Sequence, residues 1–152
     1  YQFHATGSFG KEWMPKRVMD NGVDWKNCPA LDIREYIYDM PTVMAAADIV
    51  IGRAGSATCN EIGASGTPCI LIPSPNVTNN HQEKNAMVLQ GRGAAVVVPE
   101  AGCSGKLLFD TAREILADTE RTKSMRQAAS SLAVVDSAQR IYETALELMQ
   151  SR

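Results

Sequence analysis

The chain has little excess charge and no long apolar run. Its 152 residues carry 15 Lys and Arg against 17 Asp and Glu, a formal net charge of −2. Because nucleic-acid binding needs concentrated basic residues and no basic stripe stands out, this balance argues against a nucleic-acid partner. The longest apolar runs have the length of strands, and no segment has the composition of a signal peptide. We therefore expect neither a transmembrane helix nor a secretion signal.

Cysteine and histidine are too few and too scattered for a disulfide framework or a metal centre. The four cysteines show no CxxC spacing, and there are only two histidines. Cys59 and Cys69 fall in segments that we expect to be buried. These features indicate reduced thiols in a cytosolic protein without a bound metal.

The glycine-rich motifs of dinucleotide and P-loop sites are also missing. The segment GRAGS, residues 52–56, has neither spacing,. Its chemistry still suits a phosphate, because Gly55 lets the backbone approach a ligand and Ser56 could cap a helix whose free N–H groups attract anions. A plain strand-to-helix turn also favours Gly and Ser, so both interpretations stay open.

Hydrophobic periodicity predicts strands that alternate with helices. We expect strands over residues 1–4, 31–35, 49–52, 69–72 and 94–98, and helices over 10–19, 40–47, 56–65, 81–90, 104–118, 120–132 and 137–149,. Gly66 is a typical helix stop. The alternation predicts an α/β fold, with a mostly parallel sheet covered by helices on both faces and a helical C-terminal tail.

The length of the chain is that of one domain, and we expect residues 1–152 to form a single one,. The chain starts at Tyr1, and YQFHATG begins as though it were already within a strand. We interpret the chain as a fragment that lacks its first strand-helix unit.

Polar side chains gather where two neighbouring strands are expected to end, one near Gly52 and one in the segment PSPNVTNNHQEKNA, residues 73–86. Ligands bind beyond the carboxyl ends of strands in open α/β sheets. We expect a site for a polar, phosphorylated ligand there. The residues brought together would be Arg53, Gly55, Ser56, Glu61, Asn76, Thr78, His81, Gln82 and Asn85.

Two of these residues have competing interpretations. An inward-facing Glu61 would need a partner such as vicinal sugar hydroxyls, whereas an exposed Glu61 would pair with a nearby Lys or Arg. His81 and Gln82 carry donors and acceptors that suit sugar groups, and His81 could also serve as a general base. Helix capping by Thr78, Asn79 or Asn80 would explain part of the cluster.

These segments resemble the carboxyl-terminal domain of the MurG-type N-acetylglucosaminyltransferases of glycosyltransferase family 28. The resemblance covers essentially the whole chain. It is carried by HATG (4–7), EYIYDMPTVMAAADIVIGRAGSATCNEI (35–62), GTPCILIPSP (66–75) and NVTNNHQEKNA (76–86).

The resemblance implies a Rossmann-like GT-B domain that binds UDP-N-acetylglucosamine. Glu61 would bind the ribose hydroxyls, and His81 and Gln82 would occupy the pair that contacts the sugar. The family's pair is often two glutamines, from which His81 departs. The further donor-binding residues implied are Tyr36 and Ile37 beside uracil, Gly55 and Ser56 at the diphosphate, and Arg53, Thr58 and Asn85 in family motifs.

The resemblance also implies what the parent enzyme does. It would be an inverting transferase of peptidoglycan synthesis that moves N-acetylglucosamine to lipid I at the inner face of the cytoplasmic membrane, with no cofactor and no metal. The catalytic base and acceptor site would lie in a missing amino-terminal domain, so no catalytic residue is expected here and the fragment would be inactive. Two alternatives are a soluble donor-binding subunit of another polyprenyl-diphosphate-sugar transferase and a non-catalytic nucleotide-sugar-binding module.

Overall fold

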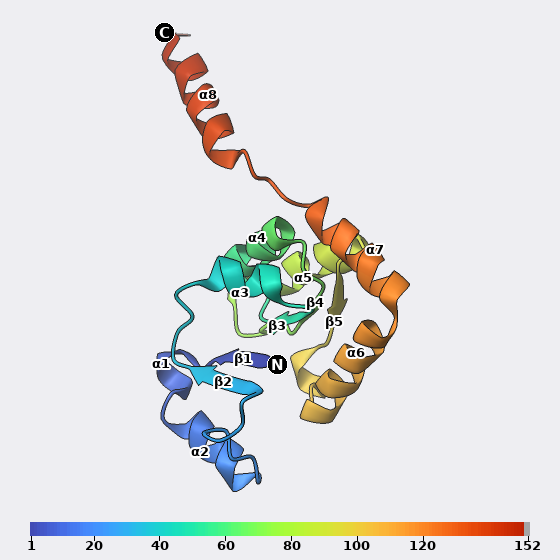
Figure 1. Ribbon diagram of the computed structural model, residues 1–152. Helices are drawn as coiled ribbons and strands as arrows, with labels where there is room; N and C mark the ends of the chain where they lie inside the picture. The colour runs from blue at the N-terminus through green and yellow to red at the C-terminus, as the bar shows by residue number, and fades with distance from the viewer. Residues whose placement is uncertain (151–152) are drawn as a thin grey trace. The chain divides into compact units, whose positions relative to one another are not determined.

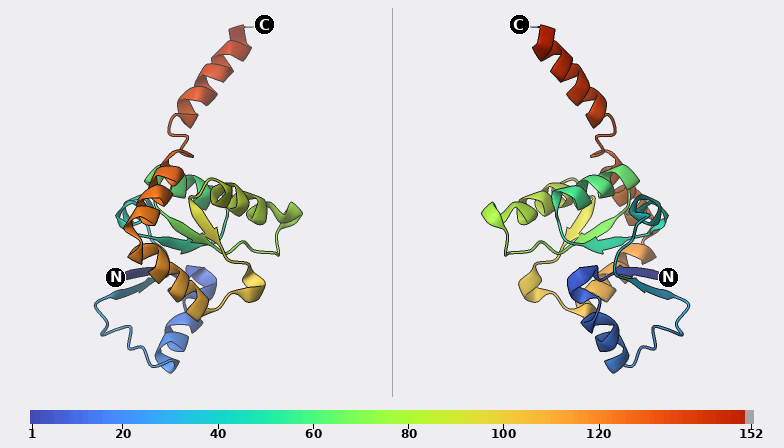
Figure 2. Two further views of the ribbon diagram at one scale, coloured as in Figure 1. Left: turned by 90° about the vertical axis from the view of Figure 1, so that its right-hand side faces the viewer. Right: turned by 90° about the vertical axis from the view of Figure 1, so that its left-hand side faces the viewer.

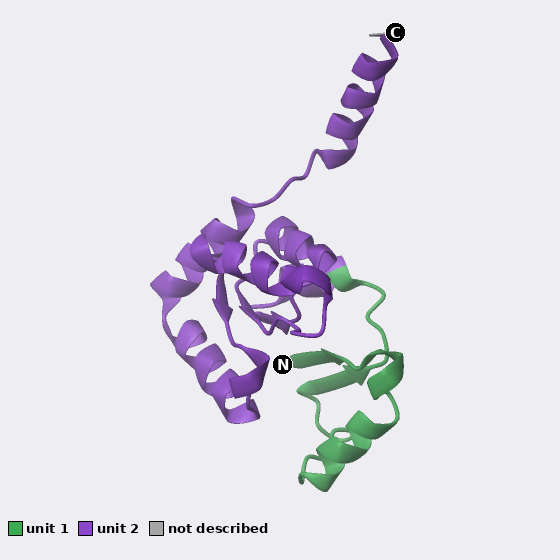
Figure 3. Ribbon diagram, turned by 180° about the vertical axis from the view of Figure 1, so that it is seen from behind, with its two compact units in different colours: residues 1–40 green, residues 41–152 purple. Residues whose placement is uncertain are grey.

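The structure is a computed structural model that describes residues 1–150. It forms two compact units, Tyr1–Met40 and a second unit from Pro41 onward (Figure 3). Ser151 and Arg152, the end of the expected domain, lie outside the described residues. This division reflects how densely residues of the chain contact one another and does not test whether each unit folds alone. The expectation of a single domain therefore stays a prediction.

The first unit contains two parallel strands and two short helices (Figure 1). Strand β1 (Gln2–Ala5) pairs with β2 (Leu31–Arg34), close to the predicted bounds. The single helix predicted over residues 10–19 is wrong, because the chain forms α1 (Gly7–Gly10) and α2 (Trp13–Asp20) instead. Pro15 lies in the first turn of α2, where its missing N–H removes no helical hydrogen bond, so the helix has to start near Trp13,.

The second unit contains a three-stranded parallel sheet in the order β3-β4-β5. Its strands are β3 (Val50–Gly52), β4 (Cys69–Leu71) and β5 (Ala95–Val97). The helices are α3 (Met40–Ala46), which starts at the boundary of the units, α4 (Ser56–Ser65), α5 (His81–Gly91), α6 (Gly105–Ala117), α7 (Thr119–Ser130) and α8 (Ser137–Gln150). Two 3-10 turns, η1 (Thr78–Asn80) and η2 (Glu100–Gly102), were not predicted.

The core of this unit lies on both faces of β4, whose three residues are fully buried. Ile70 packs with Val98, with Ile115 of α6 and with Met125 of α7. Since side chains alternate along a strand, Cys69 and Leu71 point to the opposite face. Figure 2 shows α4 and α5 on that side of the sheet and α6 on the other. The prediction of a parallel sheet with helices on both faces is confirmed.

Several helices end where the sequence predicts. Gly66 ends α4 in a left-handed conformation with φ of 64°. A Cβ atom there would lie 2.3 Å from the Ser130 hydroxyl oxygen, so any other residue would also force that hydroxyl to rotate away,. The Ser104 side chain accepts a hydrogen bond from the backbone N–H of Leu107 and so caps α6,. The Asp118 side chain caps α7 in the same way, through the backbone N–H of Arg121.

The helical C-terminal tail is also confirmed. Every residue of α8 is exposed, and its apolar side chains include Ile141, Leu148 and Met149. Within residues 1–150, none of the helices combines the length and the apolar character needed to cross a bilayer.

Candidate functional site

The ends of β3 and β4 lie side by side, as the sequence predicts. The two strands are parallel neighbours, and Gly52 at the end of β3 pairs in register with Leu71 at the end of β4. The segments that follow, residues 53–56 and 72–80, therefore start from one edge of the sheet. Eight of the ten predicted donor-binding residues lie in these segments or in the helices α4 and α5 that they lead into.

Helix α4 begins directly after the end of β3. Gly55 is its N-cap, with extended backbone angles of φ −65° and ψ 153°, and Ser56 is the first helical residue. The prediction that Ser56 caps the helix is wrong, because Gly55 occupies the N-cap position and offers no side-chain acceptor. The first N–H groups of α4 consequently carry no side-chain acceptor, and Thr58 lies beside the loop, with its hydroxyl oxygen 4.0 Å from a Cβ placed on Gly55,.

Glu61, in the second turn of α4, is exposed, so the inward-facing interpretation is wrong. An exposed glutamate would ordinarily pair with a basic side chain. Within residues 1–150 the carboxylate of Glu61 makes neither an ion pair nor a hydrogen bond, because the ion pairs there are formed by other acidic side chains. Glu61 therefore has both of its oxygens free to accept hydrogen bonds from a ligand.

Arg53 joins the ends of all three strands of this sheet. It follows β3, its Nη1 donates to the carbonyl oxygen of Ile72 after β4 at 3.2 Å, and the same atom forms an ion pair with Glu100 after β5. The guanidinium has five N–H donors, so this contact leaves donors unused. Arg53 holds the strand ends together whether or not it also contacts a ligand.

Two side chains of α5 make hydrogen bonds to the backbone of these segments. The Asn85 amide donates to the carbonyl oxygen of Ala54 at 3.0 Å, and the Gln82 Oε1 accepts the backbone N–H of Ser74 at 2.9 Å. Ala54 is fully buried. The first turns of α5 are thus fixed to the segment after β3 and to the segment after β4.

The turn before α5 has an unusual backbone. Asn79 and Asn80 have φ values of 55° and 52°, in the left-handed region that asparagine tolerates better than most residues,. No side chain caps α5, so the capping explanation for this cluster is wrong. Asn76 and Thr78 are exposed, and the Nδ1 of His81 lies 2.9 Å from the Thr78 carbonyl oxygen.

The remaining two predicted residues belong to the first unit. Tyr36 and Ile37 lie between β2 and α3. The Tyr36 side chain is 61% exposed and stacks edge-on with Tyr38, whereas Ile37 is buried at 5% exposure. Ile37 is thus packed within the chain, whereas the Tyr36 ring reaches solvent.

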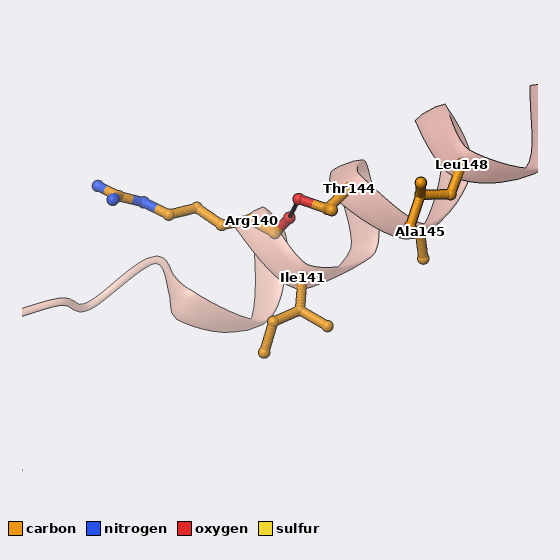
Figure 4. A pocket seen from close by; sticks show the side chains of 5 residues that line it. All are labelled: Arg140, Ile141, Thr144, Ala145 and Leu148. Carbon is orange, nitrogen blue, oxygen red and sulfur yellow. Dashed lines mark hydrogen bonds between the residues drawn. The ribbon is translucent and has the colours of Figure 1, made fainter. Parts of the chain in front are cut away.

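Two surface hollows of the described residues lie away from the predicted site. One is lined by residues of α8, namely Arg140, Ile141, Thr144, Ala145 and Leu148 (Figure 4). Another is lined by Trp13, Met14, Arg17, Val18, Asn21 and Val23. In the described part of the chain, no three His, Cys, Asp or Glu side chains are close enough to share a metal ion.

The cysteines are free thiols, and those of the second unit's core are poor nucleophiles. Burial raises the pKa of the Cys69 thiol to about 12, with a smaller contribution from Cys59. Burial also raises the pKa of Cys59. Because the thiolate is the reactive form, neither residue suits a catalytic role near neutral pH.

Sequence reasoning missed two residues that shape the site. Glu100 pairs with Arg53, and its position just after β5 could have placed it at the same sheet edge. Ser74 donates its N–H to Gln82, and the sequence Pro73-Ser74-Pro75 contains the clue. Proline has no N–H, so Ser74 supplies the only backbone donor of this tripeptide.

Comparison with known proteins decides the family. The glycosyltransferase family 28 C-terminal domain matches residues 2–141. The chain belongs to this family. The family 28 match extends over most of both units and includes all ten of the predicted donor-binding residues.

Curated relatives of this family 28 chain are named UDP-N-acetylglucosamine–N-acetylmuramyl-(pentapeptide) pyrophosphoryl-undecaprenol N-acetylglucosamine transferase. One from Acetivibrio thermocellus is 37% identical over 152 residues, which are 100% of this chain and 40% of the relative. One from Bacillus cereus is 42% identical over 147 residues, or 97% of this chain and 39% of the relative. The chain thus spans about 40% of the length of these relatives.

Solved structures agree on the fold. Acinetobacter baumannii MurG superposes on 99% of the family 28 chain with a TM-score of 0.75 and 25% identity, over 41% of its own length. The glycosyltransferase VinC, solved with dTDP, has a TM-score of 0.63 at 14% identity and covers 87% of this chain and 32% of its own. The second likeness shows the fold alone.

Proposed function

We propose that this family 28 chain is the donor-binding part of a glycosyltransferase that moves N-acetylglucosamine from UDP-N-acetylglucosamine to lipid I in peptidoglycan synthesis. The observation that carries this proposal is the identity of 37% and 42% to relatives whose names state that transfer, over 100% and 97% of the chain. The geometry at the ends of β3 and β4 supports it, since nucleotide ligands bind at such edges of α/β sheets.

Each part of the donor has a candidate partner in this proposal. The exposed, unpaired carboxylate of Glu61 accepts hydrogen bonds from the two ribose hydroxyl groups,. The uncapped start of α4 at Gly55 and Ser56, with Thr58 beside it, stabilises the diphosphate through its free N–H groups and its dipole,. His81 and Gln82 contact the sugar, and the segment of Tyr36 and Ile37 contacts uracil.

Arg53 and Asn85 act in this proposal mainly through the loops that they hold. Their hydrogen bonds to Ile72 and Ala54 fix the two segments between which the donor binds. A loose site would not keep the diphosphate against the start of α4, because positioning within about 0.5 Å is needed for a productive geometry.

The chemistry follows from this placement. A hydroxyl group of the acceptor attacks the anomeric carbon, a new glycosidic bond forms, and the bond to the diphosphate breaks as UDP leaves with inversion. The negative charge on UDP is stabilised by the start of α4 rather than by a metal ion. The base that accepts the hydroxyl proton belongs to the amino-terminal part of the parent enzyme, so this chain alone binds donor without transfer. The parent enzyme works at the inner face of the cytoplasmic membrane, where lipid I presents its sugar.

Calorimetry with the chain tests donor binding. We expect binding of UDP, tighter binding of UDP-N-acetylglucosamine, and weaker binding of UDP-glucose and UDP-N-acetylgalactosamine. A well-folded sample that binds none of the four, or binds the three sugars equally, would contradict the proposal.

Replacement of Glu61 tests the ribose assignment. Glu61→Ala should weaken UDP binding about tenfold or more, because charge-assisted hydrogen bonds to two hydroxyls are lost. Glu114→Ala is a matched control, since Glu114 is also an exposed helical glutamate without an ion pair. Equal effects of the two substitutions on the dissociation constant for UDP would show that Glu61 has no special role.

A further inference from the structure

Glu100 is an acidic residue at the edge of the sheet to which the proposed function gives no role. It follows β5 and is the first residue of the turn η2. Its half-exposed carboxylate forms an ion pair and a hydrogen bond with the Nη1 of Arg53, 47 residues earlier in the chain. By charge alone, a carboxylate close to a site for a diphosphate weakens binding of that ligand, so its place there calls for a physical reason.

The Arg53 guanidinium makes its contacts within the protein through one nitrogen atom. Nη1 donates to the carboxylate of Glu100 and, at 3.2 Å, to the carbonyl oxygen of Ile72. In the part of the chain that the structure describes, the Nε and Nη2 donors of Arg53 have no hydrogen-bond partner. Because the guanidinium group is planar and rigid, two acceptors on Nη1 also set the direction of these free donors.

The same contacts hold the short connection between β3 and α4. Arg53 directly follows β3, and only Ala54 and Gly55 separate it from the first residue of α4. The carbonyl oxygen of Ala54 accepts a hydrogen bond from Asn85. The contact with Glu100 therefore anchors the start of this connection, and the contact with Asn85 anchors its middle.

We propose that Glu100 is a positioning residue for the nucleotide and that it acts through Arg53. It holds the guanidinium across the ends of β4 and β5, and so keeps both the free donors of Arg53 and the start of α4 aligned with oxygen atoms of UDP. This alignment outweighs the repulsion between the Glu100 carboxylate and the diphosphate. The inference rests on the proposed function, and it goes beyond it by assigning a role to a residue outside the donor-binding set.

Glu100→Gln separates positioning from charge, because the two effects have opposite signs. The substitution keeps the size of the side chain and removes its negative charge. Charge alone predicts tighter binding of UDP, whereas loss of positioning should raise the dissociation constant for UDP about fivefold, since Arg53 loses its charged acceptor. Calorimetry measures this constant. The Tm should change little, because exposed ion pairs contribute little to stability.

A matched control lies at the opposite end of β3. Arg126 donates to the carbonyl oxygen of Ala47 at 3.1 Å and pairs with Asp48 at 3.8 Å, so it also joins a backbone carbonyl group and a carboxylate. These contacts precede β3, whereas the candidate site follows it. Asp48→Asn removes the same charge and should leave the dissociation constant for UDP unchanged within about twofold.

A double substitution tests whether Glu100 acts through Arg53. Arg53→Ala alone should raise the dissociation constant for UDP about tenfold, because both the free donors and the anchor of the connection are lost. Adding Glu100→Gln to Arg53→Ala should cause no further rise, since no guanidinium group remains to be positioned. Full additivity of the two effects would overturn the proposed route.

The remaining outcomes separate the inference from the proposed function. Unchanged or tighter UDP binding by Glu100→Gln overturns the positioning role and leaves the proposed function intact. Equal weakening by Asp48→Asn also overturns it, because the loss would then not depend on the place of the carboxylate. The same holds if the weaker binding of Glu100→Gln comes with a large fall in Tm. Failure of the unaltered chain to bind UDP overturns the proposed function, and the inference with it.

Discussion

The two units use parallel strands in different ways. Every residue of β4 in the second unit is fully buried, whereas three of the four residues of β1 in the first unit are exposed. Parallel strands are usually covered on both faces. The second unit satisfies this with its own helices, so the ends of β3 and β4, and the candidate site that follows them, are placed by packing within that unit.

The first unit has little core of its own. Among its residues only Gly10 and Ile37 are buried, and its sheet has two strands, a size that is marginally stable by itself,. The segment of Tyr36 and Ile37 is therefore carried by the less tightly packed unit. We infer that the segments after β3 and β4 start from a more rigid frame than the segment of Tyr36 and Ile37 does.

Ile70→Ala should have the largest effect on stability. Ile70 is fully buried in the middle of β4 and packs against Ile115 and Met125, so the substitution removes buried methyl groups and leaves a cavity. We expect the free energy of unfolding of the second unit to fall by about 2–5 kcal/mol. Denaturant unfolding followed by circular dichroism measures the change.

Two controls decide whether the contrast between the units is real. Ile51 pairs with Ile70 in register but is 45% exposed, and Ile51→Ala should cost clearly less. Phe3, in β1, is 42% exposed, and Phe3→Ala should cost about 1 kcal/mol or less,. A loss at Phe3 as large as that at Ile70 would show that the first unit has a core of comparable strength.

Thr67→Val should have an intermediate effect. Thr67 is fully buried just before β4, and its hydroxyl donates to the carbonyl oxygen of Met44 at 2.8 Å. Valine has nearly the same shape but leaves that carbonyl without its donor, which should lower the free energy of unfolding by about 1–3 kcal/mol.

The exposed helix α8 offers the comparison for this substitution. The Thr144 hydroxyl donates to the carbonyl oxygen of Arg140, also at 2.8 Å, but water can replace it there. Thr144→Val should change stability by about 0.5 kcal/mol or less. If both substitutions cost the same, burial is not what gives the Thr67 hydrogen bond its value.

Much of this contrast could be foreseen from the sequence, because burial leaves a periodic pattern. The apolar run at residues 69–72 predicts a buried strand, and Gly66 predicts the end of α4,. The break between α1 and α2 was missed, although Pro15 marks it, since the apolar spacing alone continues across it. The candidate edge was found because polar residues directly after apolar strands are visible in the sequence.

The side-chain orientations at the site could not be predicted in the same way. They depend on contacts between segments far apart in the chain, such as that of Arg53 with Glu100 and that of Asn85 with Ala54. Glu61 shows the limit most clearly. Its place in α4 was predicted correctly, but its exposure depends on how α4 packs, which periodicity in a helix of mixed composition does not determine,.

Thiol labelling sharpens the contrast between the units without altering stability. Burial raises the pKa of Cys69 in β4 to about 12, so at pH 8 this thiol is protonated and should resist iodoacetamide in the folded chain,. Cys28, in the first unit, is only partly buried and should be modified. Mass spectrometry after a short exposure measures both.

Because the folded chain holds the Cys69 proton more tightly than the unfolded chain, stability should fall as the pH rises above about 9 toward 12, and Cys69 labelling should then appear,. Equal labelling of Cys28 and Cys69 at pH 8 would mean that β4 opens as readily as the first unit.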